Sequence, residues 1–186
     1  LAVLCHDMGK PDALTRRMDG RIATPGHEVK GVEVAEGFVR QLTGQPALVR
    51  AVLPLVATHG RPNQLYEDQS GDAAIRRLAR DAGRVDRLAR VVRADRGGRG
   101  DRSDARPACA DWIERQAASL AVLDQGPPPL IQGRHLMQMG VRPGPWVGEA
   151  IHACYEAQLD GAFTDVKGGL RFLREWVERY DDEHPD

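Results

Sequence analysis

Apolar residues recur at the 3.6-residue spacing of an α-helix from one end of the chain to the other, and this periodicity is the strongest constraint on the fold. The alternation of apolar and polar residues that is typical of strands is not sustained anywhere, and aromatic residues make up only 5% of the chain. We therefore predict an all-α protein. Helices are also predicted over 71–82 and 84–96. Three apolar stripes are the clearest: His27, Gly31, Val34, Ala35, Phe38 and Leu42; Val52, Leu55, Val56 and His59; and Leu88, Val92 and Asp95 of the helix over 84–96.

Segments rich in glycine and proline separate the predicted helices. Residues 11–26 predict a loop with a turn at DGR, residues 96–107 (RGGRGDRSDARP) an exposed linker, and residues 124–130 (DQGPPPL) a rigid extended connector. We predict two domains, a helical domain over 1–105 and a C-terminal helical tail over 106–186.

The tail carries its own helical stripes. Pro145 suits a first helical position, and Thr164 is the expected N-cap of the last helix. We expect the tail to pack on the first domain, because its apolar residues cannot stay exposed in a soluble monomer. These residues are Val147, Ile151, Cys154, Tyr155, Leu170, Leu173, Val177 and Tyr180.

Composition excludes several classes of protein. With 41% hydrophobic residues and a formal net charge of −1, the chain is an ordinary globular protein whose overall charge selects no polyanionic partner. Cys5, Cys109 and Cys154 lie far apart and form no CxxC pair, so neither a disulfide framework nor a thiolate zinc site is indicated. No apolar run approaches the roughly 20 residues of a membrane span, and no signal peptide is evident, so we expect a soluble, cytoplasmic protein. Since the chain begins at Leu1, we also expect a missing N-terminal portion.

Potential metal ligands interrupt four of the apolar stripes. His6 and Asp7 follow the apolar run LAVLC, and His27, His59 and Asp95 each fall on the apolar side of a predicted helix. One buried histidine is ordinarily a hydrogen-bonded core residue. Several such residues on the apolar sides of different helices instead predict a shared site for a divalent ion. Imidazole and carboxylate ligands without cysteine suit magnesium, manganese, iron, cobalt or nickel with positions left open for water and substrate.

The ordered motifs HDMGK, GHE, THGRP and RADRGGR resemble those of the HD superfamily of metal-dependent phosphohydrolases. More narrowly, the chain is similar to the HD domain in the C-terminal half of bacterial CCA-adding tRNA nucleotidyltransferases. The segment that begins QGRHLMQMG resembles the tail that follows that domain. The resemblance covers nearly the whole chain and implies an HD-type helical bundle with a C-terminal helical tail.

The resemblance also implies roles for the candidate ligands. His6, Asp7 and Asp95 would bind a metal ion, and His27 and His59 would bind a second ion or a phosphate. HD proteins use a further histidine on a helix upstream of the His-Asp pair, and this chain begins five residues before His6. We therefore expect this chain to hold its metal weakly.

Two basic residues are candidates for contacts with substrate. Lys10 and Arg61 follow the His-Asp pair and His59 closely, so either could bind a phosphate, and arginine could do so with two parallel hydrogen bonds. The ordinary alternative for both is a solvated surface position.

The function that these residues predict is hydrolysis of phosphomonoesters or 2',3'-cyclic phosphodiesters of nucleotides or RNA ends. A divalent ion supports this chemistry by lowering the pKa of its water toward about 7. The alternative is a non-catalytic helical module that binds tRNA and belongs to a tRNA nucleotidyltransferase. An RNA contact could use a ridge of arginines at helical spacing, although interspersed aspartates also fit a solvated face: Arg76, Arg80, Arg84 and Arg87.

Overall fold

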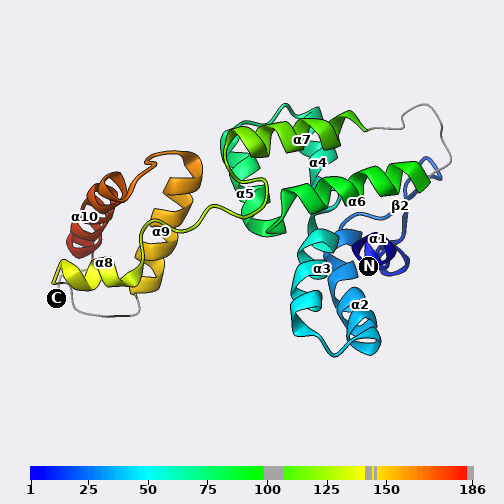
Figure 1. The fold of residues 1–186 in the computed structure, drawn as a ribbon, viewed down its shortest axis with the longest axis horizontal. Helices are drawn as coiled ribbons and strands as arrows, with labels where there is room; N and C mark the ends of the chain where they lie inside the picture. Colours follow the sequence, from blue (N-terminus) through cyan, green and yellow to red (C-terminus); the bar gives the residue numbers. More distant parts are fainter. Residues whose placement is uncertain (99–106, 141–143, 145, 184–186) are drawn as a thin grey trace. The chain divides into compact units, whose positions relative to one another are not determined.

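A computed structural model describes residues 1–98, 107–140, 144 and 146–183 (Figure 1). Helices dominate these residues, and the strands among them form one short hairpin, which confirms the all-α prediction. Most of the predicted 96–107 linker and Pro145 lie outside the described residues. None of the described helices is long and apolar enough to cross a membrane.

Residues 1–126 form one compact unit. Helices α2 and α3 lie side by side, and α7 packs on α4, α5 and α6. In chain order the elements of this unit are α1 (Ala2–Cys5), the 3₁₀ helix η1 (Pro11–Ala13), β1 (Thr15–Arg16), β2 (Ile22–Ala23), α2 (His27–Leu42), α3 (Pro46–Thr58), α4 (Arg61–Glu67), α5 (Asp72–Ala82), α6 (Val85–Gly98) and α7 (Ala108–Ser119).

Helices α5 and α6 follow the predicted spans of 71–82 and 84–96 closely. Helix α5 ends because Gly83 adopts a φ of 70°, which glycine tolerates without strain, and its N–H bonds the Ala79 carbonyl. Leu88 and Val92 of α6 are buried, so the face that carries Asp95 packs inward as predicted.

The apolar stripe expected on α2 is partly wrong. Its buried face consists of Gly31, Ala35 and Val39, whereas Val34 is 41% exposed and Leu42 is 56% exposed. Relative to the predicted orientation, α2 is rotated about its own axis, because Gly31 lies against the loop that follows the His-Asp pair. A Cβ on Gly31 would lie only 3.2 Å from the backbone nitrogen of Gly9.

The predicted loop over residues 11–26 contains a small antiparallel hairpin. Thr15 pairs with Ala23 and Arg16 with Ile22. The expected turn is present, since Gly20 adopts a φ of 80° and the Asp19 carboxylate accepts a hydrogen bond from the Arg21 N–H. Two paired residues per strand are too few to produce a detectable alternation in the sequence.

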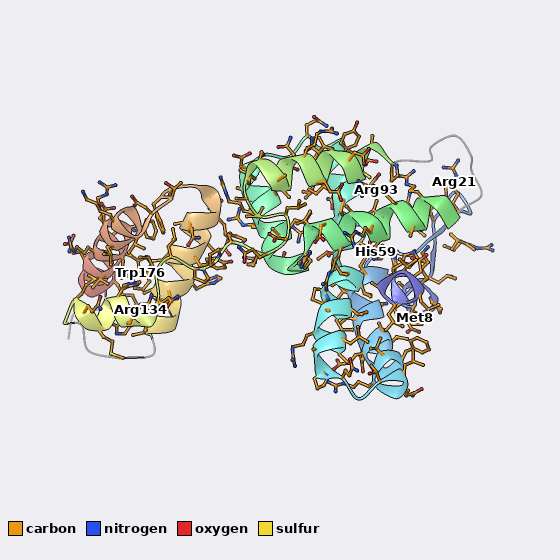
Figure 2. The ribbon with its side chains drawn as sticks, in the orientation of Figure 1. Met8, Arg21, His59, Arg93, Arg134 and Trp176 are labelled. Carbon is orange, nitrogen blue, oxygen red and sulfur yellow. The ribbon has the colours of Figure 1, made fainter. Side chains whose placement is uncertain are left out.

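Helix α7 is held on α6 by Arg93, whose guanidinium points between the two helices (Figure 2). It donates to the Asp111 carboxylate at 2.6 Å and to both oxygens of Glu114 at 3.0 and 2.5 Å. The apolar side of α7, including Cys109, Ile113 and Ala117, is buried in the core of the first unit. The compact unit therefore extends beyond residue 105, at which we predicted a domain boundary, and includes α7.

Residues 127–186 form a second compact unit with its own core, built from α8 (Gly133–Gln138), α9 (Trp146–Asp160) and α10 (Val166–Glu183). Cys154, Leu173 and Val177 are buried there as expected. The predicted cap is displaced by one residue, because the Asp165 side chain, not that of Thr164, accepts the hydrogen bond from the Gly168 N–H. Packing of the tail on the first domain stays a prediction.

Candidate metal centre

The His-Asp pair lies where α1 ends. His6 is the residue that follows the helix, and Asp7 is in the next turn. This turn passes so close to α2 that only a glycine fits at position 9, since a Cβ there would lie 2.1 Å from the His27 carbonyl oxygen. Because the two backbones lie so close together, Asp7 lies near the N-terminus of α2, where His27 begins the helix.

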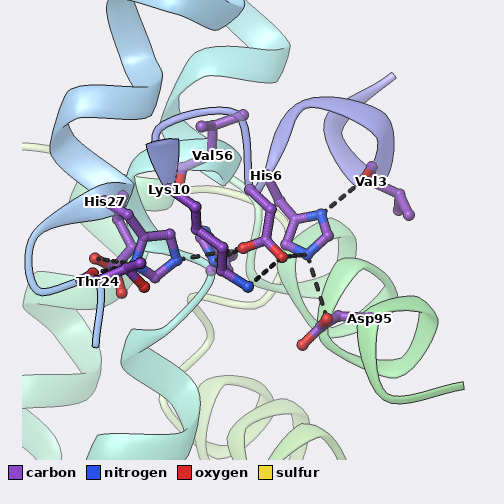
Figure 3. Close-up of polar contacts among 10 residues, drawn as sticks. Val3, His6, Lys10, Thr24, His27, Val56 and Asp95 are labelled. Carbon is purple, nitrogen blue, oxygen red and sulfur yellow. Dashed lines mark hydrogen bonds and ion pairs between the residues drawn. The ribbon is translucent and has the colours of Figure 1, made fainter. Parts of the chain in front are cut away.

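The five predicted ligands lie close together, the three histidines around the Asp7 carboxylate and Asp95 beside His6; Figure 3 labels His6, His27 and Asp95. Asp7 Oδ2 lies 3.2 Å from His6 Nε2, and Asp7 Oδ1 lies 3.3 Å from His27 Nε2 and 3.8 Å from His59 Nε2. Asp95 Oδ1 lies 3.2 Å from His6 Nε2. Residues separated by almost ninety positions in the chain thus face one another.

The three imidazoles are oriented by the same kind of local contact with the backbone. The Nδ1 atom of each ring lies within hydrogen-bond distance of the carbonyl three residues earlier: 2.7 Å for His6 and Val3, 2.8 Å for His27 and Thr24, and 2.8 Å for His59 and Val56. A carbonyl can only accept, so Nδ1 carries the proton in each neutral ring and Nε2 keeps its lone pair. Backbone carbonyls commonly fix metal-binding histidines in this manner.

The arrangement needs a positive charge at its centre. His6 Nε2 lies 3.2 Å from oxygens of both Asp7 and Asp95. Such a contact is favourable only when a cation or a proton lies between the atoms. His27 Nε2 is buried and has no hydrogen-bond partner among the described residues, as expected for an atom with no proton to donate.

The protonation states of two central groups suit metal binding. Burial lowers the pKa of His59 despite its hydrogen bond to the Val56 carbonyl, so this ring is neutral. Burial alone would raise the pKa of Asp7, but the hydrogen bond from Lys10 and the neighbouring positive charges hold it below its usual value. A neutral imidazole and an ionised carboxylate are the forms that bind metals.

Two sets of three side chains present ligand atoms that all lie within 4.8 Å of one another. The first set is His6, Asp7 and His59, and the second is His27, Glu28 and His59. Glu28 was missed by the sequence analysis, although it directly follows His27 in the GHE motif. Its carboxylate lies over Gly60, at which a Cβ would come within 2.6 Å of Glu28 Oε1.

The two basic candidates are placed differently. Lys10 lines the same cavity as Asp7 and its ammonium group lies 2.5 Å from Asp7 Oδ2. Arg61 is not among the residues lining this cavity, and its guanidinium instead donates to the Asp81 carboxylate. The cavity measures about 220 Å³ and is lined by Asp7, Lys10, His27, Glu28, His59, Gly60, Asn63, Val92, Asp95, Arg96 and Cys109.

Two curated proteins are similar to the chain along nearly all of its length. The A-adding tRNA nucleotidyltransferase of Deinococcus radiodurans is 32% identical over 188 aligned positions, which cover 95% of this chain and 41% of that protein. The CC-adding tRNA nucleotidyltransferase of Thermus thermophilus is 33% identical over 187 positions, which cover 95% of this chain and 39% of that protein. The chain thus spans less than half the length of the curated relatives that it matches.

The chain is related to the C-terminal part of tRNA nucleotidyltransferases. This relation supports the resemblance seen in the sequence, at the level of that class of enzyme. No protein-family model matches the chain, and no solved structure matches it. That this chain contains an HD domain stays a prediction.

Proposed function

We propose that this chain is a divalent-metal-dependent phosphohydrolase of the HD type, which acts on phosphomonoesters or 2',3'-cyclic phosphodiesters of nucleotides or RNA ends. The observation that carries the proposal is the orientation of three imidazoles, each with Nδ1 on a backbone carbonyl and Nε2 toward Asp7. In a merely structural cluster His27 Nε2, which is buried and has no hydrogen-bond partner among the described residues, would be paired within the protein.

His6, Asp7 and Asp95 would hold one ion, and His27, Glu28 and His59 would serve a second ion or the phosphate. A bound divalent ion would lower the pKa of water toward about 7 and neutralise charge on the phosphoryl oxygens. Manganese, magnesium, nickel, cobalt and iron all suit these nitrogen and oxygen ligands.

The residues of the chain would orient the substrate around this centre. Asp7 stays ionised, and Lys10 is close enough both to keep it so and to donate a hydrogen bond to a phosphoryl oxygen in the cavity. Arg61 would reach a phosphate only after releasing Asp81, so it is the weaker candidate for substrate binding.

Metal titration followed by a hydrolysis assay tests the proposal. The folded chain is first stripped with EDTA and then titrated calorimetrically with manganese, nickel or magnesium. We expect binding, followed by hydrolysis of bis-p-nitrophenyl phosphate or a 2',3'-cyclic nucleotide at millimolar concentrations of the added metal. If a folded chain hydrolyses neither compound with any of the ions, the tRNA-binding alternative becomes the better interpretation.

The histidines allow a second test of the assigned roles. We expect His27→Ala and His59→Ala to reduce turnover by ~10-fold or more while metal affinity falls less, because these side chains would serve a second ion or the phosphate. His152→Ala is the matched control, since this exposed histidine of α9 belongs to the other unit and should change neither quantity. Equal losses of metal affinity and turnover would assign both residues to the first ion.

The alternative function is a non-catalytic module that binds tRNA. The names of the two relatives, both tRNA nucleotidyltransferases, favour the tRNA-binding part of it. The predicted arginine ridge supports it less. Arg76 pairs with Asp72 at 3.6 Å, Arg80 with Asp81 at 2.8 Å and Arg84 with Asp86 at 2.8 Å. Carboxylates so close to the guanidinium groups weaken the attraction of this ridge for a phosphate backbone.

The cellular location belongs to the proposal as well. Cys5, Cys109 and Cys154 are buried, unpaired thiols. Free thiols of this kind are compatible with a reducing compartment, and we place the activity in the cytoplasm.

A further inference from the structure

A second cavity of about 190 Å³ adjoins the candidate metal centre. Both cavities are lined by Asn63, Arg96 and Cys109, which therefore form their shared wall. The second cavity is completed by Tyr66 and Glu67 from α4 and by Pro107 and Ala108 at the start of α7. A ligand whose phosphate lies at the metal centre would thus have space for its remaining part in this direction.

Arg96 lines both cavities and forms no ion pair with a carboxylate of the described residues. Its guanidinium donates to the side-chain oxygen of Asn63 at 2.9 Å, and this neutral amide is the partner recorded for it within the described residues. Arg93, one turn earlier on α6, is instead occupied by Asp111 and Glu114. Arg96 can therefore offer its remaining N–H groups to a phosphoryl oxygen near Asp95.

The second cavity has an aromatic residue, Tyr66, in its lining. Tyr66 is half-buried, and its ring meets that of Trp112 edge-on, with 5.7 Å between the centroids. Asn63 also donates to Glu67 Oε1 at 2.6 Å, which positions a carboxylate beside the ring. A flat aromatic face next to hydrogen-bond acceptors suits a nucleobase and its ribose better than a small alkyl phosphate.

We propose that the cavity between α4 and the start of α7 is a nucleoside subsite, in which Tyr66 stacks on the base and Arg96 holds the phosphate at the boundary with the metal centre. The inference rests on the proposed function and specifies it. The substrate is a phosphoester of a nucleoside, and the base contributes to its recognition.

Two probes that differ only in the base test this subsite. Adenosine 5'-monophosphate and ribose 5-phosphate are titrated calorimetrically into the full chain in EDTA, so that neither a metal ion nor hydrolysis contributes. We expect the nucleotide to bind at least about fivefold more tightly, the lower end of what stacking on one aromatic ring supplies. Equal affinities, or no measurable binding of the nucleotide, would overturn the proposal.

Four variants assign the affinity to its residues. Tyr66→Leu keeps an apolar side chain beside Trp112 and should abolish the advantage of the nucleotide, whereas Tyr66→Phe should retain it. Arg96→Ala should weaken both probes by a similar factor. Arg90→Ala removes the same charge from an exposed position of α6 that lines neither cavity, and it should change nothing. A base advantage that persists in a folded Tyr66→Leu protein would also overturn the subsite.

The two proposals fail in different ways. Metal-dependent hydrolysis without any preference for a base would reject the nucleoside subsite and retain the phosphohydrolase. A base advantage in EDTA that depends on Tyr66, in a chain that no metal makes hydrolytic, would retain the subsite and reject the phosphohydrolase.

Discussion

Asp7→Ala is expected to lower the affinity for a divalent ion by ~100-fold or more and to abolish hydrolysis of bis-p-nitrophenyl phosphate. The Asp7 carboxylate lies within 3.8 Å of the Nε2 atoms of all three histidines, so its loss removes the negative charge that all three share. Calorimetric titration with manganese and a rate measurement at saturating metal check the two effects separately.

The controls for this variant separate charge from fold. Asp7→Asn keeps the size of the side chain and should lose metal almost as completely, because it removes the charge. Asp12→Ala removes an exposed aspartate five residues further along and should leave both measurements unchanged. An Asp7→Ala protein that melts like the wild type and still binds manganese with unchanged affinity would contradict the assignment of this residue as the central ligand.

Gly9→Ala is expected to destabilise the first unit by about 3 kcal/mol or more, the upper range for overpacking a closely packed site. A Cβ at this position would lie 2.1 Å from the His27 carbonyl oxygen and 2.4 Å from the Gly31 nitrogen. Both atoms belong to the backbone of α2, so relief requires the loop and the helix to move apart. Denaturant unfolding of the purified variant measures the loss.

The same variant links the fold to the site. Moving α2 away from the loop would also withdraw His27 from Asp7, so metal affinity should fall together with stability. Gly37→Ala is the matched control on the same helix, since a Cβ there meets nothing within 4 Å. It should be neutral or stabilising by up to ~1 kcal/mol, because alanine favours helix more than glycine does. Equal stabilities of the two variants would contradict the close contact at Gly9.

The helices and the identity of the five candidate ligands could be predicted from local patterns. Residues three and four positions apart share one side of a helix whatever the rest of the chain does. The stripe of Leu88, Val92 and Asp95 therefore needed no knowledge of other helices. The orientation of each imidazole is also local, because its Nδ1 partner is the carbonyl three residues earlier.

The side that α2 buries could not be predicted in this way. Its stripe of apolar residues was broad, and the approach of Gly9 to Gly31 selected the part that faces the protein. The hairpin over 15–23 escaped detection because it is too short to show a period. The buried side of α2 and the hairpin both depend on contacts between different segments of the chain, and not on the spacing of residues within a single segment.

Periodicity and residue type predict an all-α protein with histidines and carboxylates on the apolar sides of its helices. How these side chains meet depends on the packing of the helices: Glu28 joins the cluster, Arg61 binds Asp81, and Arg96 borders the cavity. The reason is physical, since periodicity records which side of a helix is buried, whereas the distance between side chains on different helices depends on how the backbones pack.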